Sequence, residues 1–266
     1  MITGGIDVGI RCTKVVIRRE HEILVKKHGI AGAAKREENA KNLWLEALNE
    51  AGLKETEIQS VAVTGKGKYN ISFADLYKTE VVCLQKAAHA LAPDATMAVN
   101  LGADEILAVV LDDAEPAGIA EMAQNQKCSA GLGLLIENLA DEFGWNPTEP
   151  MSWPGCSGEL KALETISDGC AVFARMDVLE ALNRGAAKEA VMNGVLHAAA
   201  VRANSVIQDI TLPNTDQIVL CGGLSCNPMF VSELENISGM RMPALPDAQY
   251  VCAIGAAIAA AESDRE

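Results

Sequence analysis

Residues 6–17 read IDVGIRCTKVVI, and residues 99–111 repeat the pattern as VNLGADEILAVVL. In both stretches an apolar segment carries Asp or Asn, reaches a glycine, turns, and continues as a Val-rich strand. The repeat runs from Asp7 to Asn100, a spacing near 93 residues. Repetition of this kind is typical of a duplicated structural unit. The sequence therefore predicts an α/β protein built from two related sheet domains.

Hydrophobic periodicity predicts the remaining elements. Alternating apolar residues predict an antiparallel meander over 6–10, 13–19 and 22–30. Further strands are expected at 60–68, 80–84, 96–102, 105–113, 118–123 and 217–223, and helices at about 37–52, 86–92, 131–143, 172–184, 187–209 and 253–262.

The composition limits the functions that the chain can have. It has 266 residues, 49% of them apolar and 4% aromatic, and a formal net charge of −14. Nucleic-acid binding needs clustered Lys and Arg, so the charge argues against it, whereas nucleotide binding relies on backbone amides and stays open. The N-terminus alternates instead of resembling a signal peptide, and no apolar run approaches a membrane span. We therefore expect a cytoplasmic protein.

Glycine-containing turns at the ends of three predicted strands are candidate phosphate-binding loops. Asp7-Val8-Gly9, followed by Thr13 and Lys14, could hold magnesium through the carboxylate while the turn amides approach a phosphate. An ordinary hairpin turn explains this motif equally well when it is taken alone. Thr64-Gly65-Lys66-Gly67 and Cys221-Gly222-Gly223-Leu224 offer a similar close backbone approach. The three turns together favour a ligand more than any one of them does.

Two of the eight cysteines stand just before predicted helices. Cys128 lies in KCSAGLG, residues 127–133, and Cys170 lies in SDGCAVF, residues 167–173. A helix N-terminus stabilises a thiolate, and thiolates bind iron, but a cluster with four thiolate ligands needs more than two cysteines. A dimer would supply four, and the alternative is that the two cysteines are unrelated and half-buried. Cys156 has no assigned role, and the other five are interpreted as core thiols.

Four motifs resemble those of one known family. KCSAGLG (127–133) and CAVFA (170–174) are similar to its two cysteine motifs, and CGGL (221–224) and AIGAA (253–257) are similar to its glycine motifs. The family is the group of ATPases that contains the activators of 2-hydroxyacyl-CoA dehydratases and the ATP-binding subunits of ATP-dependent benzoyl-CoA reductase. The resemblance extends over nearly the whole chain and is strongest to the short D-type subunits of that reductase.

This resemblance implies the duplicated actin/Hsp70/sugar-kinase ATPase fold, with a nucleotide cleft between two domains. The domains are expected at 1–94 and 95–250, and a C-terminal helix at 251–266 is expected to pack toward the hinge. ATP and Mg²⁺ are implied as ligands, together with one [4Fe–4S] cluster shared across a dimer. The residues carried over are Asp7 and Asn100 at the catalytic positions, Gly9, Thr13, Lys14, Gly102, Gly222, Gly223 and Gly255 for the nucleotide, and Cys128 and Cys170 for the cluster.

The resemblance also implies a reaction and its partners. ATP would be coupled to low-potential electron transfer toward reductase or dehydratase subunits that act on an acyl-CoA. A ferredoxin-like protein would be the electron donor, and a homologous ATPase subunit would complete a homo- or heterodimer.

Several positions on the ATP side depart from the family pattern. Ile10 and Arg11 stand where Ser or Thr usually follows the first glycine, and Asn100 replaces the second Asp. Asn is neither a base nor a carboxylate ligand for magnesium. Arg175 replaces a Glu after the second cysteine motif. We therefore expect weak nucleotide binding or slow hydrolysis, with a better-equipped partner subunit.

Two other functions stay open at this point. A small-molecule kinase of the same fold would need a catalytic carboxylate, for which Asp104 and Glu105 are the candidates. A scaffold subunit would keep the fold and lack both ATP turnover and the cluster.

Overall fold

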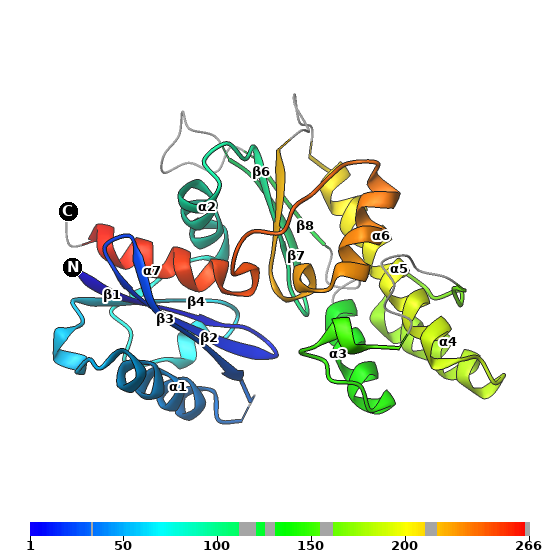
Figure 1. Ribbon diagram of the computed structural model, residues 1–266, viewed down its shortest axis with the longest axis horizontal. Coiled ribbons are helices and arrows are strands. Elements are labelled where there is room, and N and C mark those ends of the chain that lie inside the picture. Colours follow the sequence, from blue (N-terminus) through cyan, green and yellow to red (C-terminus); the bar gives the residue numbers. More distant parts are fainter. Residues whose placement is uncertain (33, 112–120, 126–130, 155–161, 211–216, 264–266) are drawn as a thin grey trace. The chain divides into compact units, whose positions relative to one another are not determined.

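The computed structural model describes residues 1–32, 34–111, 121–125, 131–154, 162–210 and 217–263 (Figure 1). Cys128 and Cys156 therefore lie outside the described residues. The chain divides into two compact units: unit 1 contains Met1–Asp94 and Gln249–Glu266, and unit 2 contains Ala95–Ala248. No helix within the described ranges is long and apolar enough to cross a membrane.

Unit 1 is built on a five-stranded sheet in the order β3-β2-β1-β4-β5. The neighbours β1–β2 and β2–β3 are antiparallel, whereas β1–β4 and β4–β5 are parallel. The strands are β1 (Ile2–Val8), β2 (Cys12–Arg19), β3 (Glu22–Ile30), β4 (Ser60–Thr64) and β5 (Leu76–Tyr77). The helices are α1 (Arg36–Ala51), α2 (Glu80–Leu91) and α7 (Val251–Ser263).

Two adjacent glycines in β1 show how the helices cover this sheet. A Cβ added at Gly4 would lie 2.5 Å from the Trp44 ring on α1, and one added at Gly5 would lie 2.0 Å from the Ala253 carbonyl oxygen on α7. Successive strand residues point to opposite faces, so α1 covers one face of the sheet and α7 the other, with α2 packed beside α7 (Figure 1). Small residues in β1 allow both helices to approach closely.

Unit 2 has a four-stranded sheet in the order β8-β7-β6-β9. Its strands are β6 (Met97–Leu101), β7 (Ile106–Val110), β8 (Met122–Gln124) and β9 (Ile218–Cys221), and its helices are α3 (Leu132–Phe143), α4 (Ala171–Asn183), α5 (Lys188–Gln208) and α6 (Pro228–Ser238). The long helix α5 contacts α3, α4, α6 and the strand β7. The core of the unit forms around this helix from aliphatic side chains, with Phe230 and Trp153 as its bulky members.

The repeat predicted from the sequence is confirmed by the strand pairing. In unit 1, β1 is antiparallel to β2 and parallel to β4, and in unit 2, β6 is antiparallel to β7 and parallel to β9. Asp7 pairs with Thr64 and Asn100 pairs with Cys221, so the two pairs are structural equivalents.

The strand expected at 80–84 is wrong, because these residues begin α2. The Thr79 side chain accepts a hydrogen bond from the backbone N–H of Val82 at 3.3 Å and caps the helix, and Glu80 stands in its first turn. Both features favour a helix start. The valines in this segment favour a strand, but the cap and the burial of one helical face favour a helix more strongly.

Candidate functional site

In unit 1 the predicted phosphate turns after β1 and β4 lie against each other. The Gly9 N–H donates to the Cys12 carbonyl at 3.1 Å, and the Gly67 N–H donates to the Val8 carbonyl at 2.9 Å. Gly65 has a φ of +90°, and a Cβ there would lie 2.6 Å from Asp7 Oδ1. Only glycine fits this position. The two turns therefore place Asp7, Gly9 and the backbone of residues 65–67 together at one edge of the sheet.

Asp7 forms an ion pair with Lys14, which faces it on β2. Lys14 Nζ lies 3.1 Å from Asp7 Oδ2, and the two side chains are 18% and 9% exposed. Burial by itself would lower the pKa of Lys14, but the charge of Asp7 and the hydrogen bond to it raise that pKa above its ordinary value. Asp7 Oδ1 and the Thr13 hydroxyl are buried without a hydrogen-bond partner in the described ranges. These unpaired oxygens fit a hydrated cation such as Mg²⁺ at the end of β1.

The equivalent turns of unit 2 have the same backbone shape and different chemistry. The Gly102 N–H donates to the Glu105 carbonyl at 2.9 Å. Gly222 has a φ of +88°, and a Cβ there would lie 2.6 Å from Asn100 Oδ1. Asn100 pairs with Leu107 across β7 where Asp7 has Lys14. Gly223 is open, with nothing within 4 Å of an added Cβ.

The thiol of Cys221 lies beside Asn100. Its Sγ is 3.8 Å from Asn100 Oδ1 and 3.5 Å from the Val99 carbonyl oxygen, both as weak hydrogen bonds. Complete burial raises the pKa of Cys221. This thiol is therefore neutral and packs as part of the turn, as the sequence interpretation expected for a core cysteine.

The start of α3 sits directly on the turn that follows β6. The Gly131 N–H donates to the Asp104 carbonyl at 3.1 Å, and the Leu134 N–H donates to the Ala103 carbonyl at 2.7 Å. A Cβ at Gly133 would lie 2.6 Å from the Gly102 carbonyl oxygen. Residues 102–104 and the first turn of α3 are therefore one rigid contact.

Cys170 is the N-cap residue of α4 and is half-buried. No side chain caps α4, and none caps α3, whose N-cap is Gly131. A Cβ added at Gly131 would lie 3.6 Å from the Ala171 Cβ, so the two helix starts are adjacent. The first-turn amides of a helix favour a negatively charged ligand, although at α3 the Leu134 amide already donates to the Ala103 carbonyl. The half-buried thiol of Cys170 at the start of α4 fits an iron–sulfur cluster. Among the residues that the structure describes, no three His, Cys, Asp or Glu side chains are grouped to hold a metal ion.

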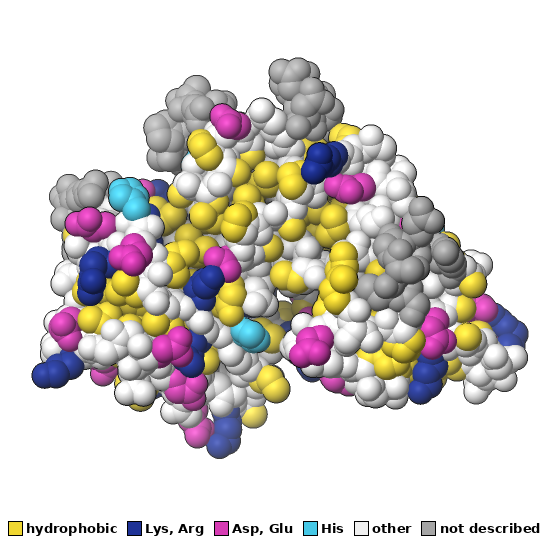
Figure 2. Space-filling view, in the orientation of Figure 1, with side chains coloured by type: hydrophobic (Ala, Val, Ile, Leu, Met, Phe, Trp, Pro, Cys, Tyr) yellow, Lys and Arg dark blue, Asp and Glu magenta, His cyan; other side chains and the backbone are white. Residues whose placement is uncertain are grey.

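The outer face of α4 next to Cys170 is apolar and exposed. Its hydrophobic side chains recur at helical spacing: Val172, Phe173, Met176 and Leu179 are 67%, 60%, 58% and 47% exposed. We refer to these four residues as the α4 stripe. Figure 2 shows hydrophobic side chains interspersed with charged ones on the surface of unit 2. A row of exposed apolar side chains on one helix is typical of a protein contact.

One other predicted site residue lies in a helix and not in a turn. Gly255 is inside α7, where an added Cβ would lie 1.8 Å from the Cys83 carbonyl oxygen on α2, so helix packing by itself accounts for this glycine. A role for Gly255 in nucleotide binding stays a prediction. Arg175 pairs with Glu142 on α3 at 2.8 Å.

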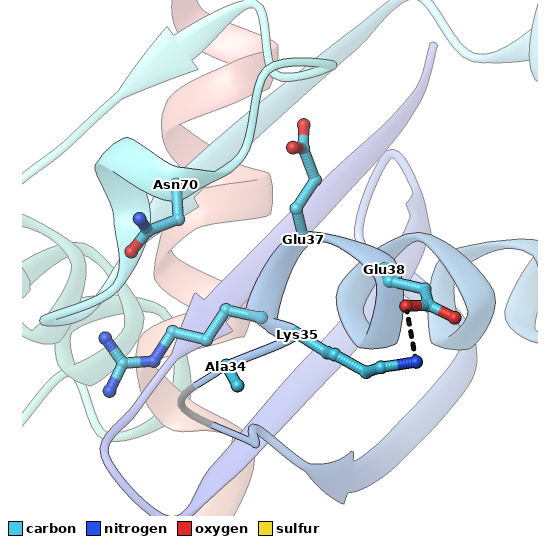
Figure 3. A pocket seen from close by; sticks show the side chains of 6 residues that line it. Ala34, Lys35, Glu37, Glu38 and Asn70 are labelled. Carbon is cyan, nitrogen blue, oxygen red and sulfur yellow. Dashed lines mark ion pairs between the residues drawn. The ribbon is translucent and has the colours of Figure 1, made fainter.

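Sequence reasoning missed two features. Arg202 on α5 donates two hydrogen bonds to the Asp168 carbonyl, near Cys170, and only helical periodicity marked this residue in the sequence. The second is an open pocket at the start of α1, lined by Ala34, Lys35, Arg36, Glu37, Glu38 and Asn70 (Figure 3). Lys35 and Glu38 pair at 3.1 Å there. The mixed charges of this pocket indicate no ligand class.

Comparison with known proteins gives the chain its relatives. Residues 5–260 match the BadF/BadG/BcrA/BcrD ATPase family. The chain is 28% identical to the activator of lactoyl-CoA dehydratase of Anaerotignum propionicum, over 99% of this chain and 98% of that protein. It is also 28% identical to the D-type benzoyl-CoA reductase subunit of Thauera aromatica, over 97% and 92% of the two chains.

Solved structures agree on the fold. The activator of the 2-hydroxyisocaproyl-CoA dehydratase from Clostridium difficile, solved with bound ADPNP, superposes with a TM-score of 0.83 at 23% identity, over 100% of this chain and 96% of that one. A ROK family glucokinase from Streptomyces griseus superposes with a TM-score of 0.59 at 12% identity, over 98% and 100%. The predicted actin/sugar-kinase type of ATPase fold is confirmed.

Proposed function

Because the chain belongs to the BadF/BadG/BcrA/BcrD ATPase family, we propose that it is an ATP-binding subunit that holds a [4Fe–4S] cluster together with a second subunit. It couples ATP to low-potential electron transfer toward a reductase or dehydratase partner. The relatives named above include an activator of a dehydratase and a reductase subunit. Which acyl-CoA the partner uses is a property of that partner.

The setting of Cys170 is the observation that carries the proposal. Its thiol stands at a helix start that no side chain caps, beside the start of α3. Cys128, three residues before Gly131, is the proposed second ligand and lies outside the described residues. When bound, the cluster would supply one-electron transfer. The chain itself would contribute two thiolates and the first-turn amides of α4.

Nucleotide binding is assigned to the two sets of glycine turns. Asp7 and Thr13 would hold the hydrated Mg²⁺, and the amides near Gly9, Gly102, Gly222 and Gly223 would approach the phosphates. Lys14 keeps its charge and adds a cation for the phosphates. Asn100 supplies no carboxylate in unit 2, so we propose slow hydrolysis by the isolated chain.

The contact between the β6 turn and α3 provides the coupling. If residues 102–104 move when a nucleotide binds, α3 would move with them, because Gly133 packs directly against the Gly102 carbonyl. The α3 start adjoins Ala171, the first residue of α4. A ligand that binds one arrangement of this turn better than another would shift the cluster helices with it.

The second subunit is proposed to be another ATPase of this family, seated on the α4 stripe. With two proposed ligands in each chain, four thiolates require two subunits, and the stripe begins two residues after Cys170. We expect Phe173→Glu to weaken dimerisation of the iron-loaded protein about ten-fold or more, measured by sedimentation equilibrium. Leu163→Glu, at an exposed leucine of the same unit outside the stripe, is the matched control. Equal weakening by both variants would exclude the stripe as the dimer contact.

Iron and acid-labile sulfide, measured on protein purified without oxygen, test the central claim. We expect about four irons per dimer, lost from the Cys128→Ser, Cys170→Ser double variant and retained in Cys226→Ser, which changes an exposed cysteine of unit 2. Iron that appears only on co-expression with a paralogous subunit would make the cluster heterodimeric. Protein that never binds iron would exclude the electron-transfer role.

A further inference from the structure

The segment that leads into Cys170, residues 164–168, packs along α5, and we refer to it as the strap. The Glu164 N–H donates to the Ala190 carbonyl at 3.1 Å. A Cβ added at Gly194 would lie 2.2 Å from the Glu164 carbonyl oxygen, so the segment and the helix touch backbone to backbone. Ile166 is buried in the core of unit 2. This part of the segment is therefore fixed before it reaches the cysteine.

Two side chains hold the last residues before Cys170. Arg202 donates from Nε and Nη2 to the carbonyl oxygen of Asp168, at 3.2 and 3.0 Å. Asp177, on the second turn of α4, accepts a hydrogen bond from the Ser167 N–H at 2.8 Å. Hydrogen bonds in which one partner is ionised are stronger than neutral ones. Residues 167 and 168 are thus tied to α5 and α4 at once.

Cys170 itself is the N-cap residue of α4. Its side chain makes no capping hydrogen bond to α4. Its sulfur position therefore depends on the backbone that precedes it, and Asp168 is only two residues away. The exposed ion pairs of Arg184 with Glu164 and Glu180 lie at the far end of the same segment and of α4. Exposed pairs of this type contribute little.

We infer that Arg202, with Asp177, is a positioning residue for Cys170: it fixes the peptide of Asp168 and so sets where the thiol stands at the start of α4. The inference rests on the proposed function, in which Cys170 is a cluster ligand. Arg202 is not proposed as a ligand of the cluster. It acts through the backbone carbonyl that it holds with a forked contact.

The first test uses iron-free protein and hydrogen exchange. In Arg202→Met, which keeps the length of the side chain and removes its donors, the Ser167 amide, which donates to Asp177, should exchange about ten-fold faster than in wild type. Arg202→Lys, with one compact ammonium in place of the fork, should give an intermediate rate. Arg184→Met should leave this rate unchanged. An unchanged rate in Arg202→Met, or equal acceleration in Arg184→Met, would overturn the inference.

The second test uses iron-loaded protein. Arg202→Met should release iron to a chelator about ten-fold faster than wild type and change the electron paramagnetic resonance spectrum of the reduced protein, with the melting temperature kept and partial rescue in Arg202→Lys. Wild-type release and spectrum in Arg202→Met would overturn the inference. The exchange experiment needs no iron, so it decides the strap even if no variant binds iron, in which case the proposed function fails.

Discussion

At the end of β1, Asp7 faces Lys14, whereas at the equivalent end of β6, Asn100 faces Leu107. The two units therefore share the backbone geometry of these strands but not the charged side chains. A carboxylate at position 100 would stand opposite leucine and beside the buried thiol of Cys221, where an unpaired charge is costly. Asparagine avoids that cost but supplies no carboxylate ligand for magnesium. The slow hydrolysis that we expect is thus explained by the surroundings of Asn100.

Asn100→Asp should restore the carboxylate and raise ATP hydrolysis by about ten-fold or more, since a positioned general base contributes at least this much. The same variant should melt at a lower temperature without Mg²⁺ and recover when Mg²⁺ and ATP are added, because the cation neutralises the new charge. Steady-state phosphate release and thermal melting measure the two effects. Adding Asp7→Asn to this variant should abolish the gain. A rate that stays at the wild-type level would show that Asn100 does not limit turnover.

The Cys83 thiol should make the protein less stable in alkali. Burial, opposed in part by the Thr64 hydroxyl, raises the pKa of Cys83 from 9.0 to about 12. Between these values the unfolded chain loses a proton that the folded chain keeps, so this contribution is complete below pH 9 and is lost as the pH rises toward 12.

Cys83→Ala should therefore flatten the decline in the free energy of unfolding above pH 9, at a cost of about 1 kcal/mol near neutrality for lost packing. Urea unfolding at several pH values, with reductant present, measures the slope. Cys226→Ser, at an exposed thiol, should keep the wild-type slope. Parallel declines in Cys83→Ala and wild type would rule out this thiol as the cause.

At the scale of elements, the sequence predicted most strands and helices because their periodicity is local. The cap that makes residues 80–84 helical was present in Thr79 and Glu80, but the valines that follow outweighed it. The strap on α5 could not be predicted, because the contact of Arg202 with the Asp168 carbonyl joins residues 34 positions apart without any charge pairing to suggest it. Crowded glycines such as Gly194 and Gly255 give the same difficulty, since their closest neighbours are backbone atoms of residues distant in the sequence.

Alanine substitutions at Gly255 and Gly223 test two different roles of glycine, helix packing and nucleotide binding. Alanine in a helix is ordinarily favoured over glycine by about 1 kcal/mol, but at Gly255 the new Cβ would overlap the Cys83 carbonyl. We expect Gly255→Ala to lose about 2 kcal/mol or more of folding stability. Gly223→Ala has open space and should unfold like wild type while binding nucleotide more weakly. Chemical denaturation and nucleotide titration separate the two, and a stable Gly255→Ala protein would contradict the packing argument.

At the scale of the whole chain, unit 1 is assembled from both ends of the sequence. α7 packs on β1, β4 and α2, and the Thr3 hydroxyl donates to the Ala257 carbonyl at 2.9 Å. Most of the described residues of α7 are buried. Nothing in its small, apolar sequence indicates which sheet it covers, because Ala-rich helices fit many surfaces. The strand repeat could be predicted from the sequence, and the partner of the last helix could not.

Because unit 2 is formed by one continuous segment and unit 1 by two, we expect the two units to differ in whether a single fragment can fold. A fragment of residues 95–248 contains the complete core of unit 2 and should unfold cooperatively by itself. Residues 1–94 lack α7, so Ala62 and Cys83 would lose the Ala256 and Ala260 contacts that bury them, and this fragment should not fold. Joining 1–94 to 249–263 through a flexible linker should restore a cooperative transition in circular dichroism. Cooperative unfolding of 1–94 without α7 would show that the face of β1 and β4 is stable without a helix packed on it. The close approach of Gly5 to Ala253 would then be a consequence of the fold and not a cause of it.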